Sequence, residues 1–231
     1  MTSGRRNRRN RSVVTARGGP SPWLIVAVVV LVLFAGAVGF GIYRAQRGDT
    51  ADVAIPPGAT ATGVPVGQGD APATIDLYQD FQCPVCKAYE QQSGATIDEL
   101  VTRGAARVVY HPVAFLDRAS STRYSSRSAA ASGCAAEAGV FPQFNKLLYA
   151  NQPPEGGDGL PAEQLVALGQ QAGASPGFAE CVSSDRYAAW TSAVTEDASC
   201  AGVNATPTVK MNGQDIENTD AALRQAVEAA S

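Results

Sequence analysis

An uninterrupted apolar run near the N-terminus is the strongest hydrophobic signal in the chain. Residues 22–43 contain WLIVAVVVLVLFAGAVGFGIY and no charged side chain. A helix rises about 1.5 Å per residue, so the run matches a hydrocarbon core of about 30 Å and predicts a transmembrane helix over 22–43. A cleaved signal peptide is the alternative. Because the run exceeds the usual apolar region of about 7–15 residues, and no small-x-small site follows Tyr43, an uncleaved anchor is favoured.

Arginines flank this run unequally. Six precede it, at positions 5, 6, 8, 9, 11 and 17, whereas Arg44 and Arg47 follow closely. Positively charged residues accumulate on the cytoplasmic side of a membrane helix. We therefore expect a cytoplasmic basic tail over 1–21, a single-pass helix in the cell membrane, and an extracytoplasmic C-terminal part.

Residues 44–62 contain Pro56-Pro57-Gly58 and alternating Ala and Thr, with little apolar material to bury. This composition is typical of a tether, so we expect a flexible linker over 44–62 and a folded domain over 63–231. Without the eight N-terminal arginines, the exported part keeps 10 basic residues against 21 acidic ones, a formal charge of −11. That charge argues against nucleic acid as a partner.

A strand, a cysteine motif and a helix follow one another within the domain. The segment 73–81 (ATIDLYQDF) mixes β-branched and aromatic residues, which favours a strand. Cys83-Pro84-Val85-Cys86 comes next. Proline suits the first turn of a helix, so we expect a helix that begins at Cys83 or Pro84 and ends between 101 and 103.

The rest of the pattern predicts an α/β fold with a helical insertion. A second strand is expected over 107–111, ending before Pro112. From about 118 to 200, Ala, Ser, Gln and Leu recur at helical spacing, and prolines divide them into four or five short helices. A hairpin over 208–216 with the turn Asn212-Gly213 and a helix beginning near Thr219 complete the chain.

Five cysteines in a domain outside the cytoplasm point to disulfide chemistry, because no glutathione pool keeps them reduced there. Two cysteines two residues apart at a helix start suit dithiol exchange. Unpaired backbone N–H groups and the positive helix end stabilise the thiolate of Cys83, the expected nucleophile, and Cys86 resolves the mixed disulfide. A zinc site is the alternative, but the other three cysteines are scattered and His111 is the sole histidine, so no metal is expected.

The motif residues resemble a known family. DFQCPVCK (80–87) and GVNATPTVKMNG (202–213) are similar to the DsbA-like branch of the thioredoxin superfamily, and the similarity extends from about Val64 to the C-terminus. The resemblance implies a thioredoxin fold interrupted by a helical domain. It also implies that Thr206-Pro207 is a cis peptide facing the cysteines, with the Thr206 backbone binding substrate peptides.

The resemblance implies partners and a direction of reaction. The expected substrates are exported proteins with cysteines, and the expected reoxidant is a quinone-linked membrane protein, DsbB-like or similar to vitamin K epoxide reductase; no bound cofactor is expected. A disulfide reductase or isomerase is the second hypothesis. A third is a membrane-tethered module that binds peptides and uses the cysteine pair only to hold a turn closed.

Two positions depart from the family pattern. Pro84 and Val85 modulate the motif, and Val85 stands where strongly oxidising members carry histidine, which indicates a weaker oxidant. Leu77 stands six residues before Cys83, where many thioredoxin-like proteins place a buried carboxylate that relays protons. The spacing argues against Asp76 or Asp80 in that role.

Three cysteines remain, and they allow three pairings. Cys134 and Cys181 both lie in the insertion, and some DsbA-like relatives carry such a bridge, so a structural disulfide between these two is favoured. Cys200 is then left over, either as a small buried hydrophobe, which we favour, or as a free thiol. The following residues are expected to pack in the core or at the domain junction, with no site role: His111, Phe115, Tyr124, Phe141 and Phe144.

Overall fold

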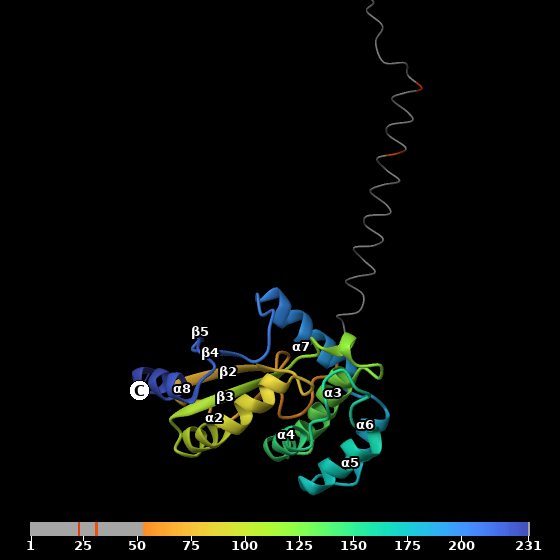
Figure 1. The fold of residues 1–231 in the computed structure, drawn as a ribbon, viewed down its shortest axis with the longest axis horizontal. Helices are drawn as coiled ribbons and strands as arrows, with labels where there is room; N and C mark the ends of the chain where they lie inside the picture. The colour runs from red at the N-terminus through yellow and green to blue at the C-terminus, as the bar shows by residue number, and fades with distance from the viewer. Residues whose placement is uncertain (1–22, 24–30, 32–52, 231) are drawn as a thin grey trace, which may run out of the picture. The chain divides into compact units, whose positions relative to one another are not determined.

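The computed structural model describes Trp23, Leu31 and residues 53–230 (Figure 1). Apart from Trp23 and Leu31, the tail expected over 1–21 and the transmembrane helix expected over 22–43 lie outside the described residues. Among the residues that are described, no helix is both long enough and apolar enough to cross a membrane. The folded unit begins at Val53.

A five-stranded mixed sheet forms the centre of this unit, with the strand order β1-β3-β2-β4-β5. Strands β2 and β3 are parallel, and the other neighbouring pairs are antiparallel. Ala73, Ile75 and Leu77 alternate along β2 and are buried, as expected for a strand at the centre of a sheet. The strands are β1 (Val64–Val66), β2 (Ala73–Gln79), β3 (Ala106–Pro112), β4 (Thr208–Met211) and β5 (Gln214–Ile216).

Strand β3 is longer than the sequence predicted. We expected it to end at His111, but Pro112 belongs to it and lies opposite Gln79 of β2. The ladder continues beyond the proline, because Val113 donates its N–H to the carbonyl of Gln79. On its other side β3 pairs with β1 only from Val108 to Tyr110, so the missing N–H of Pro112 leaves no partner unsatisfied.

Five α-helices lie between β3 and β4, in agreement with the predicted insertion. Prolines divide them as expected, because Pro142 stands in the first turn of α4 and Pro161 and Pro176 are the N-caps of α5 and α6. In Figure 1, α3 to α6 gather to one side of the sheet, and α2 and α7 lie on its opposite faces. The inserted helices are α3 (Tyr124–Glu137), α4 (Phe141–Ala150), α5 (Ala162–Gln171), α6 (Gly177–Ser183) and α7 (Ala188–Cys200).

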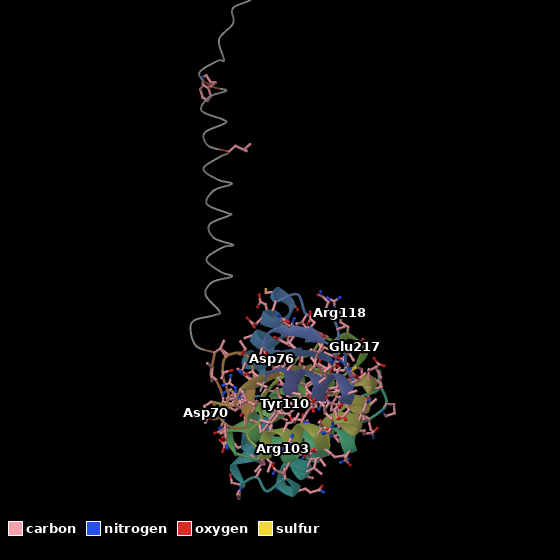
Figure 2. The ribbon with its side chains drawn as sticks, turned by 90° about the vertical axis from the view of Figure 1, so that its left-hand side faces the viewer. Asp70, Asp76, Arg103, Tyr110, Arg118 and Glu217 are labelled. Atoms are coloured by element: carbon pink, nitrogen blue, oxygen red, sulfur yellow. A yellow bond between two sulfur atoms is a disulfide. The ribbon has the colours of Figure 1, made fainter. Side chains whose placement is uncertain are left out.

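Two further helices lie outside the insertion: α2 (Pro84–Thr102) follows the cysteine motif, and α8 (Asp220–Ala230) follows the last strand. Helix α2 buries Ile97 and Leu100 in the core. Tyr110 of β3 lies near the middle of the unit, where its ring contacts Phe141 at a centroid distance of 5.2 Å (Figure 2). Phe141, Phe144 and Tyr124 are each at most 2% exposed, which confirms their expected packing role.

The last part of the expected linker, residues 53–62, packs on the folded unit. Pro56 is buried. Buried Trp190 donates its indole N–H to the carbonyl of Thr60 at 2.8 Å, and His111 Nδ1 lies 2.6 Å from the carbonyl of Thr62. A segment poor in apolar side chains is thus held through its backbone carbonyls, which composition does not reveal.

Candidate active site

The cysteine motif stands where β2 leaves the sheet and α2 begins. Cys83 has an extended backbone (φ −74°, ψ 117°) and is the N-cap residue of α2, and Pro84 occupies the first helical turn. The N–H of Cys83 donates to the carbonyl of Asp80 at 3.0 Å, which closes the turn between strand and helix. This arrangement places the Cys83 sulfur beside the unpaired N–H groups of the helix start.

The two sulfurs differ in their surroundings. Both cysteines are unbonded in this structure, which is therefore that of the dithiol form. Cys86 is 2% exposed and Cys83 6%, whereas Val85 between them is 60% exposed. The motif therefore presents Val85 at the surface and keeps Cys86 below it.

Hydrogen bonds make the Cys83 thiol acidic. The side chain of Cys86 and the backbone N–H groups of Cys86 and Val85 lower the pKa of Cys83 from 9.0 to about 6, against the opposing effect of burial. The pKa of Cys86 moves in the opposite direction, well above its ordinary value, first because of burial and then because of its neighbour Cys83. One sulfur is thus ready to carry a negative charge and the other to hold a proton.

A second segment completes the site from the far end of the sequence. The Thr206–Pro207 peptide bond is cis, and the carbonyl oxygen of Thr206 lies 3.4 Å from the Cys83 sulfur. Asn218 holds this loop from behind, because its side-chain N–H donates to the carbonyl of Pro207 at 2.7 Å. A cavity of about 290 Å³ lies beside the loop and is lined in part by Val203 and Ile216.

Asp80 is a buried carboxylate close to the motif, although spacing argued against it. Leu77, six residues before Cys83, is apolar core at 1% exposed, and Asp80 is fully buried. Its oxygens accept hydrogen bonds from Gln82 N–H (2.9 Å), the Ser125 hydroxyl (2.7 Å) and Leu116 N–H (2.9 Å). Burial raises its pKa to about 6, and these donors oppose the rise.

The three donors give Asp80 a structural role, whereas spacing argued against it as a proton relay. They come from the turn itself, from the loop after β3 and from α3, so the carboxylate ties the motif to the insertion. Asp76 takes part in none of these hydrogen bonds. It pairs instead with His111, whose Nε2 lies 3.0 Å from its carboxylate and whose ring stacks on Tyr78.

Two glutamines, which were not predicted from the sequence, link the motif to the insertion. Gln82 donates to the carbonyl of Leu116 at 2.7 Å and lies 3.3 Å from the Ser125 hydroxyl. Gln152, from the loop between α4 and α5, donates to the carbonyls of Phe81 and Cys83. Glutamine at these positions does not stand out in the sequence pattern, because its partners are backbone groups that are distant in the sequence.

The remaining cysteines are separate from this site. Cys134 of α3 and Cys181 of α6 form a disulfide with their Cα atoms 5.9 Å apart, which is the favoured pairing. Cys200 is a free thiol at the end of α7 and is exposed, so the expectation of a buried small hydrophobe is wrong. Within residues 53–230, no cluster of His, Cys, Asp or Glu has the composition of a metal site.

An acidic CxxC cysteine at a helix start, facing a cis-proline loop in a five-stranded α/β fold, defines the class of thiol-disulfide oxidoreductases. The chain belongs to the thioredoxin family: the family model described as Thioredoxin matches residues 59–229. Within that superfamily it is DsbA-like, as its similarity to solved structures shows.

Two of the similar structures come from Mycobacterium tuberculosis. Its DsbA in the oxidised form is 34% identical with a TM-score of 0.66, over 73% of this chain and 92% of that one. Its disulfide bond oxidoreductase DsbG, in the reduced form, is 34% identical with a TM-score of 0.63, over 74% of this chain and 85% of that one.

A curated relative is the serine/threonine-protein kinase PknE of the same organism. It is 36% identical over 156 residues, which make up 63% of this chain and 27% of the kinase. The chain thus matches about a quarter of the length of that relative. The similarity says nothing of kinase activity in this chain.

Proposed function

We propose that this chain is a membrane-anchored, extracytoplasmic oxidoreductase that forms disulfides in exported proteins, with Cys83 as nucleophile and Cys86 as resolving cysteine. The observation that carries the proposal is the asymmetry of the pair. The pKa of Cys83 is lowered to about 6, and that of the deeper Cys86 is raised. Dithiol exchange needs one sulfur that leaves or attacks readily and a second that completes the step.

The oxidising cycle begins with the Cys83–Cys86 disulfide. A substrate thiolate attacks the Cys83 sulfur, a mixed disulfide forms, and Cys86 leaves and takes up a proton. A second substrate thiolate then attacks the substrate sulfur of the mixed disulfide and releases Cys83 as a thiolate. The substrate has lost two electrons and gained a disulfide, and the enzyme has become the dithiol.

Electrostatics favours this direction. Stabilising the Cys83 thiolate stabilises the dithiol product, and every pKa unit below ambient pH adds about 1.4 kcal/mol, or about 30 mV of oxidising power. A pKa of about 6 for Cys83 lies below neutral pH. Because Val85 supplies no imidazole, we place the chain among the weaker oxidants of its family.

Substrate contact is assigned to the surface around Cys83. The backbone of Thr206, next to cis Pro207, faces the sulfur and offers hydrogen-bonding groups to an extended peptide. Val85, between the two cysteines of the motif, is 60% exposed and offers an apolar side chain to the substrate. Both features suit unfolded, cysteine-containing chains better than one folded partner.

The location and the electron acceptor are part of the same proposal. The apolar run over 22–43 and the six arginines before it support an anchor with a cytoplasmic N-terminus. The dithiol must be reoxidised for a second turnover, and a quinone-linked membrane protein, DsbB-like or similar to vitamin K epoxide reductase, fits an anchored dithiol.

A reductase or isomerase function is the second candidate. The same site would serve this function if the Cys83–Cys86 disulfide is more stable, relative to the dithiol, than the low pKa of Cys83 indicates. Membrane-tethered peptide binding without catalysis is the third, and it predicts that Cys83→Ser retains full function.

Refolding of a reduced, disulfide-dependent substrate separates these candidates. We expect the oxidised wild-type protein to restore substrate activity, Cys83→Ser to fail, and Cys200→Ser to behave as wild type because its side chain is exposed and outside the site. Equal refolding by wild type and Cys83→Ser establishes the binding-module alternative. Recovery only of scrambled substrate, with none of reduced substrate, favours the isomerase.

A further inference from the structure

The loop between α4 and α5 reaches the redox motif through one side chain. Gln152 is half-buried, and its amide nitrogen lies 3.0 Å from the carbonyl of Phe81 and 2.9 Å from that of Cys83. A glutamine amide has two hydrogens to donate, and both are used here. The bonds join the helical insertion to the Phe81–Gln82 and Cys83–Pro84 peptide units.

The bond to the Cys83 carbonyl matters because of the residue that follows. Pro84 has no N–H, so the peptide unit between Cys83 and Pro84 is held only through its carbonyl oxygen. That oxygen has two donors, the N–H of Lys87 at 3.2 Å and the amide of Gln152. The first bond belongs to α2 itself. The second comes from outside the helix and fixes the orientation of the Cys83–Pro84 peptide unit at the helix start.

The orientation of this peptide unit bears directly on the reacting sulfur. The N–H groups that stabilise the Cys83 thiolate belong to Val85 and Cys86, the first residues after Pro84. A rotation of the unit moves these N–H groups relative to the Cys83 sulfur. A donor that fixes the carbonyl therefore also fixes the groups that stabilise the thiolate.

We propose that Gln152 is a positioning residue of the redox site: its amide fixes the Cys83–Pro84 peptide unit and thereby tunes the reactivity of the Cys83 sulfur. This inference rests on the proposed function and deepens it. The helical insertion then covers the thioredoxin-like part and also influences the reduction potential of the Cys83–Cys86 pair. Substitutions in the α4–α5 loop change redox behaviour without touching either cysteine.

Three variants of the full chain test this role in a Cys200→Ser background. Gln152→Met keeps a side chain of similar length without donors. Gln152→Glu places a carboxylate against two carbonyl oxygens when ionised and regains one donor when protonated. Asn151→Ala is the matched control, because the neighbouring side chain donates only to the carbonyl of Leu147 within α4.

The readouts are the alkylation rate of Cys83 against pH and the equilibrium of the Cys83–Cys86 pair with glutathione. For Gln152→Met we expect the equilibrium to shift towards the disulfide by about fivefold, the factor that one neutral hydrogen bond represents. For Gln152→Glu we expect a larger shift at neutral pH than at acidic pH. Asn151→Ala keeps the wild-type values.

Wild-type values for both Gln152 variants overturn the proposal, as does an equal shift in Asn151→Ala. The pH comparison within Gln152→Glu uses one protein preparation, so it stands even if Gln152→Met folds poorly. A pH-independent defect in Gln152→Glu indicates a merely structural role. Failure of the proposed function is distinguishable, because the wild-type protein itself then shows either no exchange with glutathione or a potential near that of thioredoxin, whatever the variants do.

Discussion

The Cys83 sulfur lies 3.4 Å from the carbonyl oxygen of Thr206, although 123 residues separate them in the chain. The sheet brings them together. Strands β2 and β4 are antiparallel, and Tyr78, near the end of β2, lies opposite Thr208 at the start of β4. The motif after β2 and the loop before β4 therefore meet at the same edge of the sheet.

The acidity of Cys83 depends first on Cys86. Because the Cys86 side chain is the largest cause of the lowered pKa, we expect Cys86→Ala to raise the pKa of Cys83 from about 6 towards 9.0. The ultraviolet absorbance of the thiolate against pH measures it, with Cys200→Ser in both proteins to remove the exposed thiol. An unchanged midpoint contradicts the assignment and leaves the helix N–H groups as the main cause.

The reduced protein should become more stable as pH rises from about 6 to 9. Folding lowers the pKa of Cys83 from 9.0 to about 6, so the stabilisation is complete above the unfolded value and is lost as pH falls through the folded one. Denaturant unfolding of the dithiol form measures it, and Cys83→Ser should lack this part of the pH dependence. Parallel curves for the two proteins contradict the prediction.

The disulfide in the insertion should contribute stability without setting the redox equilibrium. Its loop spans 47 residues. We expect the double substitution Cys134→Ala and Cys181→Ala to lower the free energy of unfolding by about 3–4 kcal/mol in the chain-entropy model. Urea unfolding measures the loss. The glutathione equilibrium of Cys83–Cys86 serves as the control, and a change there shows that the bridge also shapes the site.

Asp80 should anchor the turn through its acceptor oxygens. In Asp80→Asn one oxygen becomes an NH₂ group that faces a donor, so we expect a loss of about 1–3 kcal/mol of unfolding free energy near neutral pH. Folding raises the pKa of Asp80 from 3.8 to about 6. The contribution of Asp80 to the free energy of unfolding therefore falls as pH rises from about 4 to about 6. The gap between wild type and Asp80→Asn should therefore widen from pH 7 to pH 4. A gap that narrows contradicts the assignment.

Much of the fold was predictable because its signals are local. The β-branched run over 73–81, the proline at the helix start and the Asn212-Gly213 turn each report a short segment. Strand β1 was not predicted, since three residues with a central proline carry no alternating pattern. Pro112 was misjudged because its acceptability depends on where β1 ends, which is a tertiary property.

The candidate site divides in the same way. The cysteine motif and the Thr206-Pro207 loop are each recognisable as a run of consecutive residues. The resemblance to DsbA-like proteins predicts that the two runs lie together. Asp80 and Gln152 act through backbone groups of other elements, so only the folded chain shows which partners they have. The exposure of Cys200 likewise depends on which face of α7 remains uncovered, and composition does not report it.

The direction of exchange is tested most directly by the reduction potential of the Cys83–Cys86 pair, measured by equilibration of the Cys200→Ser protein with reduced and oxidised glutathione. We predict a potential well above the value of about −270 mV for thioredoxin and somewhat below the value of about −120 mV for DsbA. A potential near that of thioredoxin contradicts the oxidase and assigns the same dithiol to reduction.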